Sequence, residues 1–177
     1  MTYLASNRQL PSIVAMVNQL PYDYLDGHGI DFEPYDEFLS LEKTQAWLKE
    51  WTGNEDAPGD RLAIFGQDGS GGYVAFWITD VDKPLTTQPV VFLSSKGECA
   101  VISSNFCDYL WLLAGNHGAR EAFSYACDGA GVNESFAVFA SMYAKTPKRS
   151  PITILRDAQL AHPAFASWIN ELRRQLK

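Results

Sequence analysis

The stretch most suggestive of chemistry is glycine-rich, GQDGSGG at positions 66–72, and it lies between two apolar runs. Glycines beside a carboxylate and a hydroxyl can cradle a phosphate, but a P-loop also needs Lys-Ser/Thr after the glycines and then a helix. Here Tyr73 and an apolar run follow instead. Asp68, Ser70 and Asp80 also lack the spacing and the closing Glu of a calcium-binding loop. We therefore expect no metal or cofactor, and we expect Asp68 to hydrogen-bond the backbone of its own turn.

The histidines and cysteines do not form a recognisable catalytic or metal-binding set. They are His28, His117, His162, Cys99, Cys107 and Cys127, and they show neither metal-ligand spacing nor a CxxC pair. No GxSxG nucleophile elbow is present, although a catalytic triad is a spatial arrangement that spacing does not reveal. We expect His117 in a polar loop, the cysteines as buried structural thiols, and no enzymatic activity.

Charge is unevenly distributed along the chain, whose net charge is −7. Residues 1–60 carry 11 acids and 3 bases, whereas residues 145–177 carry 2 acids and 7 bases. An acidic body argues against nucleic acid as a partner, because phosphate binding needs a basic face. It is compatible with a basic protein partner, although charge alone favours the simpler interpretation of a solvated surface that maintains solubility.

The overall composition is that of an ordinary globular domain. The chain has 177 residues, of which 46% are hydrophobic and 20% charged. No run reaches the roughly 18 apolar residues of a membrane span, and the first residues show no secretory-signal pattern. We expect a cytoplasmic protein with no membrane association.

Short apolar runs separated by turn residues predict an antiparallel sheet. The expected strands are residues 61–65, 73–78, 90–93 and 99–103, and residues 30–35 are expected to be extended. The links are too short for parallel crossovers, so a meander is favoured. Before the sheet, a helix is expected after Leu10-Pro11, and a second over residues 41–51 with Ser40 as its N-cap.

The second half of the chain is predicted to be helical. We expect helices over residues 106–113, 119–127 and 133–144, then a basic, proline-bounded linker at 145–151, and a last amphipathic helix starting at Pro163. The predicted organisation is an α+β core at 1–117 and a helical C-terminal extension at 118–177 packed on the same domain.

The order of these features resembles the SUKH superfamily, also called the SMI1/KNR4 family. The matching parts are Leu10-Pro11, Asp31 to Pro34, the helix at 41–51, the Gly-x-Asp-Gly-x-Gly stretch between two apolar strands, Pro-Val-x-Phe at 89–92, and Ser-x-Phe-x-x-Tyr-Leu at 104–110. The resemblance covers residues 10–115. It implies an α+β fold with a twisted, mainly antiparallel sheet flanked by helices, here with additional C-terminal helices.

The resemblance also implies a function. Many bacterial members are immunity proteins that bind and neutralise a cognate toxin, often a nuclease, and fungal relatives are regulatory scaffolds. The first expectation is therefore a non-catalytic immunity protein, and the alternative is a regulatory interaction module without a toxin partner. The expected partner-binding residues are the acids of two loops and one aromatic, namely Asp23, Asp26, Asp31, Glu33, Asp36, Glu37, Glu55, Asp56, Asp60 and Trp111.

Overall fold

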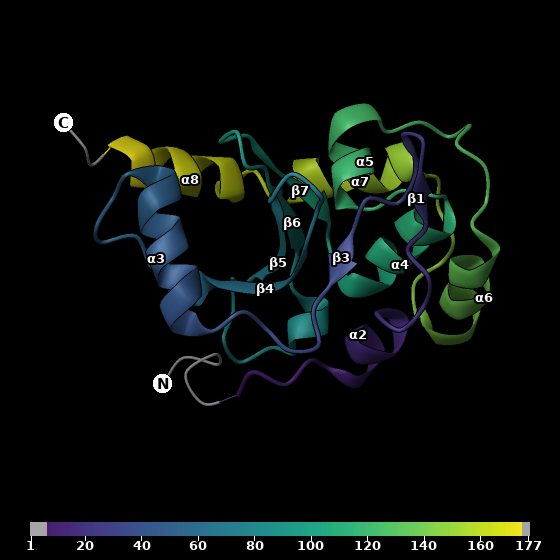
Figure 1. Ribbon diagram of the computed structural model, residues 1–177, viewed down its shortest axis with the longest axis horizontal. Helices are drawn as coiled ribbons and strands as arrows, with labels where there is room; N and C mark the ends of the chain where they lie inside the picture. Colours follow the sequence, from purple (N-terminus) through teal and green to yellow (C-terminus); the bar gives the residue numbers. More distant parts are fainter. Residues whose placement is uncertain (1–6, 175–177) are drawn as a thin grey trace.

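The computed structural model describes residues 7–174 and shows an α+β fold, as expected (Figure 1). The main sheet has five antiparallel strands in the order β3-β4-β5-β6-β7. Their bounds are Glu33–Pro34, Leu62–Gln67, Tyr73–Trp77, Val90–Leu93 and Cys99–Ser103. Each strand pairs with the next along the chain, so the predicted meander is confirmed.

The glycine-rich stretch forms the turn between β4 and β5. The Asp68 side chain accepts hydrogen bonds from the backbone N–H groups of Ser70, at 2.9 Å, and of Gly72, at 2.8 Å. Gly71, with φ of 85°, is the residue of this turn in the left-handed region. Asp68 therefore holds its own turn, as predicted.

Both faces of the sheet are buried. On β4 and β5, Phe65 and Phe76 point into one apolar cluster, whereas Ile64 and Trp77 point into the other. This explains why the strands read as continuous apolar runs and not as alternating patterns. In Figure 1, α3 and α8 lie on one side of the sheet, and α4, α5 and α6 lie on the other.

The helices begin and end largely where their capping residues predict. They are α2 (Ser12–Val17), α3 (Leu41–Thr52), α4 (Phe106–Ala114), α5 (Ala119–Tyr125), α6 (Glu134–Tyr143), α7 (Pro151–Ala161) and α8 (Ala164–Arg174). Ser40 caps α3 by accepting from the Lys43 N–H, and Gly53 ends it with φ of 72°. Asn105 caps α4 by accepting from the Asp108 N–H. No helix within residues 7–174 is long and apolar enough to cross a bilayer.

The sequence did not predict α7, which begins at Pro151, the last residue of the expected linker at 145–151. Ser150 is its N-cap and Pro151 its first residue, a usual helix start. Ile154 of α7 packs in one apolar cluster and Ala158 in the other. The helix thus lies beside the edge strand β7 and helps to complete the core on both sides of the sheet.

Candidate protein-interaction surface

A small hairpin projects from the loop that precedes β3. It pairs β1 (Tyr24–Leu25) with β2 (His28–Gly29), and Asp26 and Gly27 form its turn. Both turn residues have positive φ, 53° and 80°, which is the geometry of a two-residue type I′ turn and explains the Asp-Gly pair. The sequence predicted a turn-rich loop here, so the hairpin refines that prediction.

Gly29 is required at the base of the hairpin. Its φ is 100°, and a Cβ added there would lie 2.0 Å from the Asp23 carbonyl oxygen. The following residue, Ile30, donates its N–H to that same oxygen at 3.0 Å. An isolated two-stranded hairpin is only marginally stable, so the hairpin depends on the contacts below it.

Aromatic packing supports the hairpin from one side. The Tyr22 ring lies 4.9 Å from the Phe32 ring and 4.8 Å from that of Phe136 on α6, measured between centroids. Phe32 and Phe136 belong to the main apolar cluster. The chain that enters the hairpin is therefore fixed to the core.

Polar contacts around Asp31 fix the chain that leaves the hairpin. Its carboxylate accepts the Gly69 N–H at 2.9 Å and pairs with Arg120 on α5, while its own N–H donates to Glu121 at 2.6 Å. Arg120 also lies 3.8 Å from the Asp68 carboxylate. Asp31, whose side chain is only 13% exposed, thus joins the hairpin to α5 and to the β4–β5 turn.

The electrostatics of this cluster follow from burial and from the paired charges. Burial lowers the pKa of Arg120, but the hydrogen bond and charge of Asp31 outweigh it and leave that pKa raised. Burial raises the pKa of Glu121, and hydrogen bonds from backbone N–H groups oppose this only in part. The cluster therefore pairs the single cation Arg120 with the carboxylates of Asp31 and Asp68, which anchors the chain below the hairpin.

The outer surface of the hairpin combines exposed apolar and acidic side chains. Leu25 is 75% exposed and Tyr24 44%, and Tyr125 at the end of α5 is 55% exposed. Tyr24 interacts electrostatically with both Arg120 and Tyr125, so the two tyrosines lie near each other. Asp23 and Asp26 are exposed and pair with no cation among residues 7–174. Residues 23–29 together with Tyr125 are termed the hairpin surface below.

The structure does not bring all the predicted acids together. Glu33 accepts from Gln67, Glu37 pairs with Arg8, and Asp36 is exposed near them. The second acidic loop follows α3, which lies at the opposite end of the molecule from β1 (Figure 1). Its acids are Glu55, Asp56 and Asp60. The Glu55 carboxylate lies 3.9 Å from the Lys49 Nζ. A single small partner face therefore cannot cover both loops.

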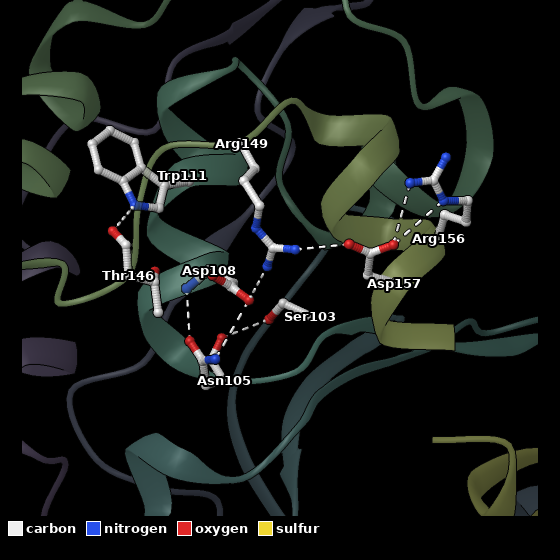
Figure 2. A network of polar contacts seen from close by, with 8 residues as sticks. All are labelled: Ser103, Asn105, Asp108, Trp111, Thr146, Arg149, Arg156 and Asp157. Carbon is white, nitrogen blue, oxygen red and sulfur yellow. Dashed lines mark hydrogen bonds and ion pairs between the residues drawn. The ribbon is translucent and has the colours of Figure 1, made fainter. Parts of the chain in front are cut away.

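Trp111 lies in neither acidic region. It is half-buried on α4, and its Nε1 donates to the Thr146 carbonyl at 2.9 Å. Beside it, Arg149 bridges the buried carboxylate of Asp108, at 2.6 Å, and that of Asp157 on α7, at 2.8 Å (Figure 2). These contacts fasten the basic linker to α4 and α7.

The remaining titratable groups include two corrections to the sequence analysis. His117 lies in the loop between α4 and α5, as expected, but its side chain is buried, at 1% exposure, and accepts from the Cys127 N–H. The three cysteines were expected to be buried, but Cys99 and Cys107 are only partly buried and Cys127 is exposed. Cys99 and His162 line one pocket, where burial raises the pKa of the thiol and lowers that of the imidazole. No group of three potential metal ligands occurs within residues 7–174.

Tyr24, Leu25 and Tyr125 were not among the partner-binding residues expected from the sequence. The first two precede Asp26-Gly27, a strong hairpin signal whose flanking strands are too short to show alternation. Tyr125 carries no signal of its own. Comparison of the chain with family models, with curated proteins and with solved structures gave no match.

Proposed function

We propose that this chain is an immunity-type protein that binds and neutralises a basic protein toxin without catalysis. The observation that carries the proposal is the hairpin surface, where exposed Leu25 and Tyr24 lie between the unpaired carboxylates of Asp23 and Asp26. Exposed apolar side chains with a charged surround are typical of protein-binding sites. The family resemblance of residues 10–115 supports the same class.

Charge indicates which partners would fit. Residues 21–37 contain six carboxylates and no lysine or arginine. Nucleases bind phosphate through basic surfaces, so an acidic hairpin would cover the surface that such a toxin needs for its substrate. Complementary charge would speed association, and the desolvated Leu25 and tyrosines would slow dissociation.

The test is co-expression with the product of the adjacent toxin-like reading frame, followed by kinetic measurement of the purified pair. We expect cell survival and a stable complex. Asp23→Asn with Asp26→Asn should slow association about 10-fold at low salt. Leu25→Ser should raise the dissociation rate about 30-fold, the effect of losing a hot-spot side chain.

The matched control is Glu50→Gln with Asp56→Asn, which removes the same charge at the α3 end. It should bind like the wild type. Cell death without a complex would refute the proposal, and a complex that only the control variant weakens would move the site to the second acidic loop.

The alternative, a regulatory interaction module, is favoured by a different feature. A groove of about 460 Å³ between α2 and α6 exposes Met16, Val138 and Met142. A partner docked there would bind independently of salt and of Asp23, and Val138→Glu would abolish its binding. The two candidate functions therefore predict opposite results for the double variant Asp23→Asn, Asp26→Asn and for Val138→Glu.

A further inference from the structure

A separate hollow of about 480 Å³ is formed by four segments of the second half of the chain. Trp111 and Ala114 of α4 form one wall, Ala137 of α6 forms another, and residues 128–132 and 148–151 close the remaining sides. Its volume lies in the range of small-molecule sites. We term it the Trp111 pocket, and it shares no residue with the hairpin surface.

The start of α7 faces this pocket, but its hydrogen-bond donors are already used. Pro151 has no N–H, the Ile152 N–H donates to Asp128 at 3.2 Å, and the Thr153 N–H donates to Ser150 at 3.3 Å. Arg149 is occupied by two carboxylates (Figure 2). The pocket is therefore no phosphate cradle, since neither the helix donors nor the guanidinium remain available.

What remains is an apolar wall with one uncompensated cation. The Trp111 Nε1 is satisfied by Thr146, so the indole contributes only apolar surface. Lys148 is exposed at the lining and pairs with no acid in the described part of the chain. The Asp128 carboxylate caps the positive end of α7, which offsets its charge.

We propose that the Trp111 pocket binds a small organic acid with a ring-sized apolar body. The ring would lie against Trp111, Ala114 and Ala137, and the carboxylate would pair with Lys148. Residues 128–131, Asp-Gly-Ala-Gly, provide an adaptable rim, because an added Cβ at Gly129 or Gly131 meets no atom within 4 Å. This site is independent of the proposed toxin binding.

The experiment uses the full chain and two probes of equal shape, 2-naphthoate and its neutral counterpart 2-naphthylmethanol, in calorimetric titrations. We expect 2-naphthoate to bind about 2–5-fold more tightly than the alcohol, the effect of one exposed ion pair. Lys148→Gln should remove that difference. Lys145→Gln, a lysine of the same linker outside the pocket lining, should leave it unchanged.

A second variant separates pocket binding from surface adsorption. Ala137→Leu places a larger side chain on the apolar wall where the ring would lie while retaining Lys148, so it should abolish binding of both probes, with a cooperative thermal melt as proof of folding. Binding that survives Ala137→Leu, or equal binding of the two probes to the wild type, would overturn the proposal. So would a hexapeptide ending in Phe that binds 10-fold more tightly than 2-naphthoate, because the occupant would then be a protein C-terminus.

Discussion

Arg149→Met tests whether the basic linker is a structural part of the fold. Arg149 joins the linker to α4 through Asp108 and to α7 through Asp157 (Figure 2). The Asp108 side chain is 3% exposed, and besides Arg149 its carboxylate is contacted by Asn105 at 3.4 Å. Methionine keeps most of the apolar stem of arginine but leaves this buried charge without its cation.

The expected loss follows from burial. Removing one partner of a buried ion pair costs about 3–5 kcal/mol. The Arg149 side chain is 32% exposed, so water reaches the pair in part and the lower value, about 3 kcal/mol, applies. In a protein of this size each kcal/mol lowers the melting temperature by about 2–4 °C, so we expect a decrease of about 6–12 °C.

Thermal and urea unfolding of the wild type and three variants would check this reasoning. Adding Asp108→Asn to Arg149→Met removes the stranded charge and should recover most of the loss. Arg156→Met makes the same charge change at a side chain that is 62% exposed, and it should cost less than about 1 kcal/mol. An Arg149→Met protein that melts within about 2 °C of the wild type, or a double variant without recovery, would refute the argument.

Three further predictions follow from other contacts. The folded protein binds the Glu121 proton more strongly than the unfolded chain does, since burial raises that pKa above its ordinary value of 4.5. The stabilisation of the folded state by this proton is complete below the ordinary pKa and is lost as pH rises through the pKa of the folded state. The urea midpoint should therefore fall less between low and neutral pH for Glu121→Gln than for the wild type. Equal decreases in the two proteins would contradict this. Gly29→Ala should open the hairpin, seen as faster amide exchange in residues 23–30 with a retained cooperative melt, whereas Gly129→Ala, with open space around it, should change neither. Truncation after residue 144 removes the buried side chains of α7 and α8 and should abolish cooperative melting; a sharp transition in the truncated chain would show that residues 145–177 are not needed for the core.

The sheet could be predicted from the sequence because its signals are local. Each strand from β4 to β7 is a short run rich in β-branched and aromatic residues between turn residues, and adjacent strands in the chain are adjacent in the sheet. The cap of α3, Ser40, was readable for the same reason, since a capping side chain contacts its own helix. The missed α7 also had a local signal, Ser150-Pro151, which was interpreted as the end of a linker.

The supports of the candidate site could not be predicted, because they join distant parts of the chain. Arg120 is 89 residues from Asp31, and Arg149 is 41 residues from Asp108. No periodicity or spacing relates such residues. Asp31 therefore looked like the other acids of its loop, whereas its position makes it the anchor of the hairpin surface.

That anchoring separates two contributions to the proposed binding. A hairpin already fixed by Tyr22 and Asp31 loses little conformational entropy when a partner binds, so the exposed Leu25 can contribute most of its burial energy to the complex. Asp23 and Asp26 act earlier, by steering encounter, and salt screens this effect. Loosening the anchor with Arg120→Met should therefore weaken binding about equally at low and high salt, unlike loss of the two aspartates, whose effect should disappear as salt rises. If both changes showed the same salt dependence, the hairpin would bind through charge alone, and its fixed geometry would have no role in recognition.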